Sequence, residues 1–115
     1  MMRPTLRRYF RHGLFPQLLV FEAVVRLGGV TRAALELHLA QPTVSTQLRK
    51  LSDALGVTLI EWRGRDLHLT PAGRELYACC SELLLLFGSM ERRLAPHRDS
   101  PTGLPDSAPA AAPAG

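Results

Sequence analysis

Cysteine is scarce in this 115-residue chain, which limits how its fold can be stabilised. The only two cysteines, Cys79 and Cys80, are neighbours, and neighbouring residues in a helix do not bond to each other. A disulfide-stabilised secreted scaffold is therefore excluded, and a reducing cytoplasm, with association to the nucleoid, is the expected location. Redox sensing remains an alternative role for the pair, although small apolar helix residues are the commoner case.

Long apolar runs and catalytic constellations are also missing. No stretch approaches the roughly 20 apolar residues of a membrane-spanning helix, so no membrane partner is expected. No Ser/His/Asp set, glycine-rich phosphate loop or carboxylate pair forms a recognisable pattern, which argues against an enzyme. His38 and His68 have no cysteine or carboxylate at ligand spacing, so no metal and no other cofactor is expected.

Negative charge is absent from residues 1–13, which carry Arg3, Arg7, Arg8 and Arg11. Residues 14–95 hold nine cationic and eight anionic side chains, so most of the formal net charge of +4 lies in the first 13 residues. The sequence pI near 9.8 thus does not indicate a uniformly basic nucleic-acid coat, and positioned contacts must carry specificity. We expect residues 1–13 to be a flexible basic extension, either an arm that grips DNA or simply an extended start.

Three helices are predicted before residue 56 from apolar residues at helical spacing. The first covers about residues 15–27, with Leu18, Phe21 and Val25 as its buried stripe, and ends at Gly28. Residues 31–55 then indicate two helices joined by a tight turn. The first of these has Thr31 as its expected N-cap and a buried side formed by Ala33, Ala34, Leu37 and Leu39.

The second helix of this pair has Pro42 in its first turn and Gly56 as its C-cap. Its buried stripe is expected to be Val44, Leu48, Leu51 and Leu55. The opposite face carries uncharged hydrogen-bonding groups followed by cations: Gln41, Thr43, Ser45, Thr46, Gln47, Arg49 and Lys50. That order fits a recognition helix whose first half meets base edges in a DNA groove while its later cations meet phosphates. The alternative is an ordinary solvated helix face.

Residues 57–70 change in character, because short alternating or β-branched runs flank Arg63-Gly64-Arg65. This pattern predicts a two-stranded hairpin with a basic tip, the wing of a winged helix-turn-helix. Arg63 and Arg65 could be ordinary tip charges, but in a wing they would contact the minor groove or its phosphates.

A long helix is predicted for residues 71–95, with Thr70 as its cap and Pro71 at its first position. Its apolar residues repeat at intervals of four and three, the 3.5-residue period of a two-stranded coiled coil. The expected dimerisation residues are Leu76, Cys80, Leu83, Phe87, Met90 and Leu94. Since the run of leucines at 84–86 widens this stripe, one side is expected to pack on its own domain and the other on a second copy. Residues 96–115, rich in proline and alanine, are predicted to be a disordered tail.

Residues 18–73 resemble the N-terminal DNA-binding part of LysR-type transcriptional regulators. The resemblance rests on TRAALELHLAQPTVSTQLRKL for the helix-turn-helix and ALGVTLIEWRGRDLHLTPAG for the turn, wing and start of the linker helix. Thr46, Ile60 and Trp62 depart from the family's usual residues, and a short threonine reads less of a base edge than arginine does. The resemblance therefore implies a preferred DNA sequence that differs from that of relatives or is less sharply defined.

The resemblance implies a mainly α winged helix-turn-helix, organised as residues 14–70 for DNA binding and 71–95 for pairing. It adds a phosphate contact from Thr31, with Arg32 beside it, to the DNA-contacting set. The expected set is Thr31, Arg32, Gln41, Pro42, Thr43, Ser45, Thr46, Gln47, Arg49, Lys50, Arg63 and Arg65.

The function expected from these features is sequence-specific binding of double-stranded DNA by a homodimeric transcriptional regulator. The family's larger inducer-binding domain is expected to be absent, because the chain ends shortly after the linker helix. The alternative is a protein-interaction or dominant-negative subunit that pairs with full-length regulators through the linker helix.

Overall fold

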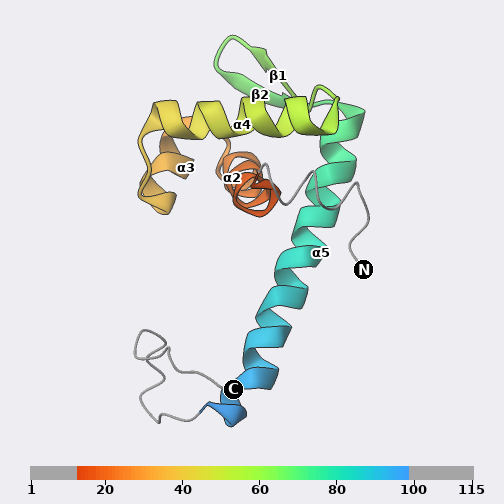
Figure 1. The fold of residues 1–115 in the computed structure, drawn as a ribbon. Coiled ribbons are helices and arrows are strands. Elements are labelled where there is room, and N and C mark those ends of the chain that lie inside the picture. The colour runs from red at the N-terminus through yellow and green to blue at the C-terminus, as the bar shows by residue number, and fades with distance from the viewer. Residues whose placement is uncertain (1–12, 99–115) are drawn as a thin grey trace. The chain divides into compact units, whose positions relative to one another are not determined.

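The structure, a computed structural model, describes residues 13–98. The elements run in the order α2 (Leu14–Leu27), α3 (Val30–Leu37), α4 (Gln41–Leu55), β1 (Ile60–Arg63), β2 (Asp66–Leu69), α5 (Pro71–Leu94) and a 3-10 turn at Ala95–His97 (Figure 1). The expected fold class is confirmed: a mainly α winged helix-turn-helix with a two-stranded hairpin and a long C-terminal helix. The chain divides into two compact units between Glu82 and Leu83, inside α5.

Helix α2 supplies more of the core than its sequence pattern predicts. Val20, Ala23 and Val24 are buried together with Phe21, whereas the predicted stripe contained only Phe21 of these four. The buried surface is wider because both α3 and α4 pack against α2. A helix with two covering partners buries more than the single stripe that an amphipathic pattern describes.

The N-cap of helix α3 lies two residues earlier than expected, which corrects the role of Thr31. The N-cap is Gly29, and no side-chain cap bond is present there, so Thr31 lies exposed inside the first turn. Leu39 is also not part of the buried side, because the helix ends at Leu37 and Leu39 lies 39% exposed in the turn that follows. His38 ends the helix with a left-handed backbone (φ 58°).

Helix α4 follows its prediction closely. Pro42 lies in the first turn, and Gly56 (φ 71°) ends the helix by donating its backbone N–H to the carbonyl of Ser52 at 2.8 Å. Val44 and Leu51 are fully buried, while Leu48 and Leu55 pack against the core from partly buried positions. The apolar stripe therefore fixes which face of α4 is turned outward.

The hairpin pairs β1 and β2 in antiparallel register, with Trp62 opposite Leu67 and Arg63 opposite Asp66. The strands are shorter than expected, because residues 57–59 form an irregular connection instead of the start of β1. Side chains alternate between the two faces of a strand, so Trp62 shares a face with Ile60, which packs on the core.

The junction between the hairpin and α5 is tightly built. The Thr70 hydroxyl donates to the carbonyl of Thr58 at 2.6 Å and accepts the N–H of Gly73 at 2.9 Å, which confirms Thr70 as the cap. A Cβ on Gly73 would lie 2.1 Å from the carbonyl oxygen of Leu59. Only glycine therefore allows the first turn of α5 to approach the chain entering the hairpin this closely.

The first half of α5 contributes to the core of its own unit. Cys80 is 2% exposed and clusters with Phe21, Leu51 and Leu59, and Leu76 packs against the same cluster. Since a side chain enclosed as Cys80 is offers no surface to a second copy, Cys80 does not fit the pairing role predicted for it, whereas Leu76 is only partly buried and its pairing role stays a prediction.

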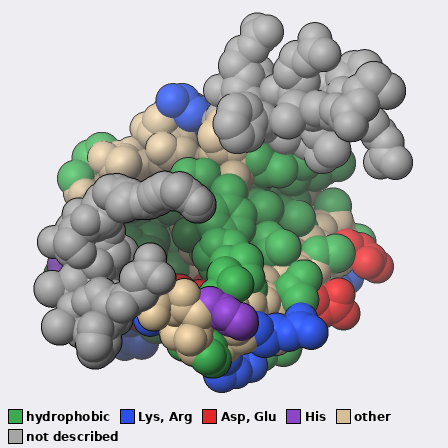
Figure 2. All heavy atoms as spheres, turned by 60° about the horizontal axis from the view of Figure 1, so that its bottom comes forward, with side chains coloured by type: hydrophobic (Ala, Val, Ile, Leu, Met, Phe, Trp, Pro, Cys, Tyr) green, Lys and Arg blue, Asp and Glu red, His purple; other side chains and the backbone are tan. Residues whose placement is uncertain are grey.

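The second compact unit contains the rest of α5, which ends at Leu94, one residue before the predicted limit. Leu85, Leu86, Phe87, Met90 and Leu94 are exposed there. Figure 2 shows that hydrophobic side chains gather on the face of the molecule that it presents. The predicted basic extension lies outside the described residues except for Gly13, and so does the predicted tail except for residues 96–98.

Candidate DNA-binding surface

The outward face of α4 carries most of the predicted DNA contacts. Gln41, Pro42, Thr43, Ser45, Arg49 and Lys50 are exposed, and Thr46 and Gln47 are half-buried. The only acidic residue in α4 is Asp53, so the first three turns present neutral donors, acceptors and cations without a carboxylate. The N-terminal end of a helix carries a partial positive charge, which favours anions near this face.

Two further predicted residues lie on α3. Thr31 and Arg32 are both exposed in its first turn. Because α3 packs directly against α4, they belong to the same structural unit as the α4 face. Thr31 does not cap α3, but its side chain is exposed near the N-terminal end of the helix, where the predicted phosphate contact would be made.

The two arginines of the hairpin, Arg63 and Arg65, lie in different environments. Arg65 lies in the two-residue turn, exposed, whereas Arg63 is the last residue of β1. A guanidinium nitrogen of Arg63 lies 3.9 Å from a carboxylate oxygen of Glu61, and Asp66 is its partner across the strands. Arg63 thus has carboxylates nearby on its own hairpin.

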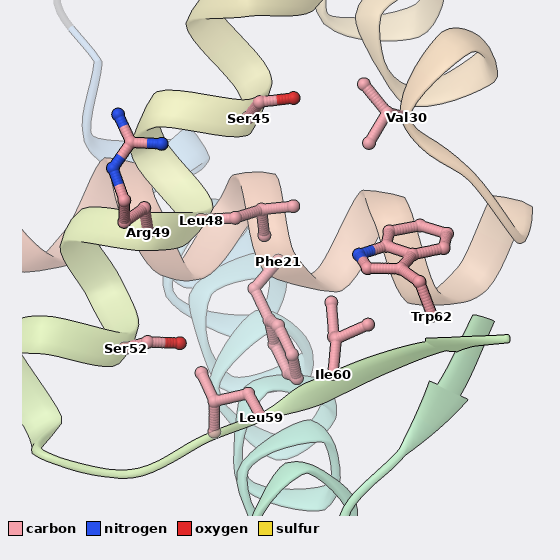
Figure 3. Close-up of a pocket in the computed structure, with 9 residues that line it drawn as sticks. All are labelled: Phe21, Val30, Ser45, Leu48, Arg49, Ser52, Leu59, Ile60 and Trp62. Atoms are coloured by element: carbon pink, nitrogen blue, oxygen red, sulfur yellow. The ribbon is translucent and has the colours of Figure 1, made fainter. Parts of the chain in front are cut away.

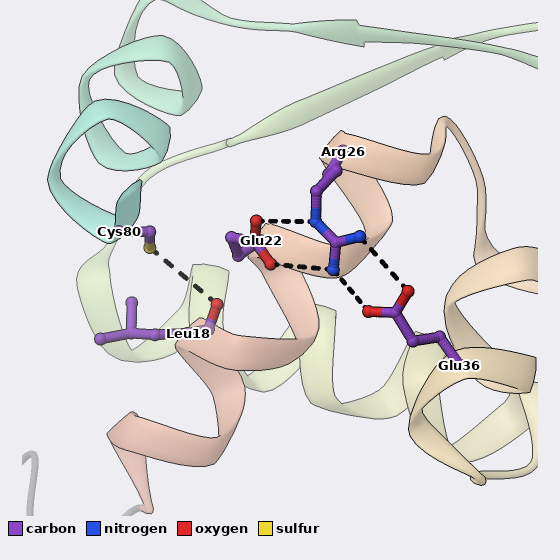
Figure 4. A network of polar contacts seen from close by, with 5 residues as sticks. All are labelled: Leu18, Glu22, Arg26, Glu36 and Cys80. Atoms are coloured by element: carbon purple, nitrogen blue, oxygen red, sulfur yellow. Dashed lines mark hydrogen bonds and ion pairs between the residues drawn. The ribbon is translucent and has the colours of Figure 1, made fainter. Parts of the chain in front are cut away.

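An ion-pair network that the sequence analysis missed ties α2 to α3 (Figure 4). The Arg26 guanidinium donates to Glu22 at 2.9 Å, and it also donates to the carboxylate of Glu36 on α3. These hydrogen bonds raise the pKa of Arg26 above its ordinary value, and Arg26 in turn lowers the pKa of Glu36. The network helps to fix α3, and with it Arg32, relative to α2. The four-residue spacing of Glu22 and Arg26 is a sequence signal for the first pair, but the pair with Glu36 depends on the tertiary fold.

A pocket of about 300 Å³ lies between α4 and β1 (Figure 3). Ser45 and Ser52 line it from α4, Trp62 lines it from the hairpin, and Leu48 and Ile60 contribute apolar side chains. Trp62 is 46% exposed, although it faces the core side of the hairpin. From sequence alone, Trp62 is only a departure from the family's usual residues and has no predicted place in the site.

Other kinds of site were sought in the same region. Within residues 13–98, no group of three or more His, Cys, Asp or Glu side chains is arranged to hold a metal ion. None of the helices in this described part is both long enough and apolar enough to cross a membrane. Burial raises the pKa of the Cys80 thiol to about 11, which keeps it protonated, while Cys79 is exposed.

Comparison with known proteins finds similar bacterial transcriptional regulators. Residues 15–74 match the family model described as bacterial regulatory helix-turn-helix protein, lysR family. The RuBisCO operon transcriptional regulator of Allochromatium vinosum is 53% identical over 66 residues, which are 57% of this chain and 22% of that protein. The transcriptional activator CmpR of Synechocystis is 52% identical over 58 residues, which are 50% of this chain and 19% of that protein. The chain thus spans about a fifth of the length of these curated relatives.

Solved structures extend the likeness to the whole described fold. The DNA-binding domain of CbnR in complex with DNA superposes with a TM-score of 0.64 at 38% identity, covering 73% of this chain and 98% of that one. The DNA-binding domain of BenM, bound to catB site 1 DNA, gives 0.62 at 36% identity, covering 70% of this chain and 92% of that one. With a family model that covers more than half of its residues, and with the fold of these DNA-bound domains, the chain belongs to the LysR family of DNA-binding transcriptional regulators.

Proposed function

We propose that this chain binds a specific double-stranded DNA sequence as a homodimer, with residues 14–70 contacting DNA and α5 pairing the two copies. The observation that carries the proposal is the α4 face. Through Ser52 it is exposed or half-buried and free of carboxylates, and it lies beside an arginine-tipped hairpin in one compact unit. The DNA complexes of the CbnR and BenM domains, which have a similar fold, support DNA as the partner by analogy.

Base recognition is assigned to the first half of α4. Gln41, Thr43, Ser45 and Thr46 carry short or planar hydrogen-bonding groups near the start of the helix, where recognition helices reach base edges. Gln47 is half-buried and adds a further amide at the edge of this face. Pro42 contributes a rigid, apolar surface in the first turn.

Backbone contacts are assigned to the cations around that region. Arg49 and Lys50 are exposed later in α4, Arg32 lies at the start of α3 with Thr31, and Arg65 and Arg63 lie on the hairpin. Cations at the edges of a recognition helix position a protein on the duplex without reading its sequence.

Pairing is assigned to the second half of α5. Leu83, Phe87, Met90 and Leu94 repeat with the spacing of a coiled-coil seam, and the last three are more than a third exposed. Two recognition helices joined in this way would contact successive major grooves of an inverted repeat.

The first experiment measures binding by fluorescence anisotropy across a range of salt concentrations. A duplex enriched by selection from random sequences is compared with its scrambled version. We expect tighter binding to the selected duplex and affinities that fall with salt for both. Equal affinities and equal salt slopes would reject specific recognition, and a dimer that binds neither duplex would support the protein-interaction alternative.

Two substitutions separate base contacts from backbone contacts. Gln41→Ala or Ser45→Ala should cost about 1–3 kcal/mol of binding free energy on the selected duplex and little on the scrambled one. Lys50→Ala should weaken binding to both duplexes similarly and flatten the salt slope by about one unit. Equal losses on both duplexes for Gln41→Ala would contradict its role in base recognition.

A further inference from the structure

The pocket between α4 and β1 combines polar groups at its rim with an apolar interior. Ser45 and Ser52 are seven residues apart, two turns of α4, so both hydroxyls lie on the side of the helix that lines the pocket. The indole of Trp62 stands across from them, with its nitrogen on the side toward α4 (Figure 3). Leu48 and Ile60 form part of the apolar interior.

Apart from Arg49, the side-chain hydrogen-bond donors that line this space are uncharged. Figure 3 shows the guanidinium of Arg49 directed away from Trp62, so the charged group lies at the edge of the pocket. No carboxylate lines the pocket, although Glu61 is adjacent in sequence to Trp62. An occupant with strong acceptor oxygens and an apolar part would therefore fit it better than a cation would.

The position of the pocket indicates that the occupant is a segment of the DNA backbone. A protein that places a helix in the major groove and a hairpin in the neighbouring minor groove must straddle the sugar-phosphate backbone between those grooves. The pocket lies between the helix and the hairpin that the proposed function assigns to these grooves. A backbone segment there would bring phosphate oxygens and a deoxyribose to the pocket.

Resting on the proposed function, we propose that this pocket seats one phosphodiester group of the bound DNA. Trp62 Nε1–H and the Ser52 hydroxyl donate to the phosphate oxygens, Ser45 at the rim remains the base contact proposed above, and the indole ring packs on the adjoining deoxyribose. Trp62 is thus a DNA-binding residue of this chain, and its contact is to the backbone and is made without charge.

The absence of charge gives this contact a distinctive signature. Salt dependence of DNA binding reflects counterions released by cationic side chains, so a neutral donor contributes affinity with little effect on the salt slope. Trp62→Phe keeps an aromatic ring and removes the N–H, whereas Trp62→Ala removes both. We expect about a tenfold weaker affinity for Trp62→Phe, the size of a hydrogen bond to a charged group, and a larger loss for Trp62→Ala.

Both losses should be similar on the selected and the scrambled duplex, and the salt slope should stay that of the wild type. Lys50→Ala, which should flatten the slope, is the matched contrast. Leu35→Ala, which shortens a side chain that is 73% exposed on α3 and outside the pocket, is the control for loss of apolar surface and should bind like the wild type. Circular dichroism and thermal unfolding establish that each variant is folded.

A second readout identifies the phosphate. Duplexes with a single neutral methylphosphonate linkage, moved stepwise along the site, should weaken wild-type binding strongly at the linkage that occupies the pocket. At that linkage the same replacement should cost Trp62→Phe much less, because the variant has already lost the hydrogen bond. Trp62 is also the only tryptophan in the chain, so its fluorescence should change on binding either duplex.

The outcomes separate this inference from the function on which it rests. A wild-type chain that binds no duplex overturns the proposed function. Wild-type affinity in both Trp62 variants overturns only the phosphate seat. A loss confined to the selected duplex would make Trp62 a base-reading residue, and equal methylphosphonate effects in wild type and Trp62→Phe would place the phosphate elsewhere; both overturn the inference.

Discussion

The two halves of α5 carry one continuous apolar repeat and yet have different surroundings. Cys80, in the first half, is 2% exposed, whereas Phe87 and Leu94 in the second half are 41% and 53% exposed. The first half is enclosed by residues of its own unit, and the second half presents apolar side chains at its surface. A period of 3.5 residues therefore identifies an apolar stripe without telling whether the same chain or a second copy covers it.

The difference begins at the junction with the hairpin. Thr70 bonds to the carbonyl of Thr58 and receives the N–H of Gly73, which fixes the first turn of α5 against the chain entering β1. Gly73 approaches the Leu59 carbonyl so closely that a methyl group has no room. Gly88, in the second half, is different, since an added Cβ there would meet only a side-chain nitrogen of Arg92 at 3.5 Å.

The largest effect is expected from Gly73→Ala. The new Cβ would overlap the Leu59 carbonyl, and because backbone has to move, we expect the free energy of unfolding to fall by about 3 kcal/mol. Chemical denaturation at fixed protein concentration measures this change. A stability equal to that of the wild type would show that the junction is loosely packed. The junction would then not explain why the first half of α5 is more buried than the second.

The next largest effect is expected from Phe87→Glu, which tests the exposed half. If the second half of α5 pairs two copies, a charge in the seam should raise the dimer dissociation constant by about 100-fold, as expected for loss of a central aromatic contact. Sedimentation velocity over a concentration series measures this. Leu85→Glu is the control, because Leu85 is 74% exposed and lies two residues from the seam position, on the opposite side of the helix. Equal dissociation constants for the two variants would contradict pairing through the face of α5 that contains Phe87.

Sequence reasoning predicted the elements well because they depend on local signals. Pro42 and Gly56 delimit α4, and Thr70 caps α5, as their residue types suggest. The prediction was wrong at the start of α3, where the expected N-cap was Thr31 and the observed N-cap is Gly29. A shift of one or two residues in a helix start depends on how the preceding turn is packed, and residue preference does not encode that packing.

The sequence predicted which types of residue form the candidate DNA-binding surface. It did not predict which of them lie close together. The polar face of α4 follows directly from the apolar stripe on its other side. The grouping of Trp62 with Ser45 and Ser52 depends on hairpin register and on how β1 docks, and no pattern within a single element contains that information. Gly73 was equally hidden, because a glycine in a first helical turn gives no sign of the carbonyl that it approaches.

A smaller effect, dependent on pH, is expected from Cys80. Burial raises the pKa of its thiol to about 11 from an ordinary value of 9.0, with neighbouring Cys79 and Glu22 adding to the shift. The folded chain thus holds this proton at a pH where the unfolded chain has lost it. The resulting stabilisation is fully present below the unfolded pKa and is lost as pH rises through the folded value.

We therefore expect the free energy of unfolding to fall between about pH 9 and pH 11, in reducing buffer, more steeply for the wild type than for Cys80→Ala. Denaturation curves at several pH values measure the difference in slope. Cys79→Ala, which removes the exposed thiol and only a lesser cause of the shift, should keep most of the slope of the wild type. An unchanged slope in Cys80→Ala would show that the first half of α5 is less enclosed than its burial indicates.

The smallest effect is expected from Gly88→Ala in the second half of α5. Alanine favours a helix interior over glycine by up to about 1 kcal/mol, and the space around Gly88 accepts a Cβ, so we expect unfolding to become harder by about 0.5–1 kcal/mol. Gly88 follows Phe87 and lies outside the seam repeat, so the dimer dissociation constant should not change. Thermal unfolding and sedimentation, run on the same samples, measure both quantities. A methyl group that weakened the dimer would mean that the partner approaches Gly88 itself, and the pairing face would then have to be rotated by about one residue around the helix, or 100°.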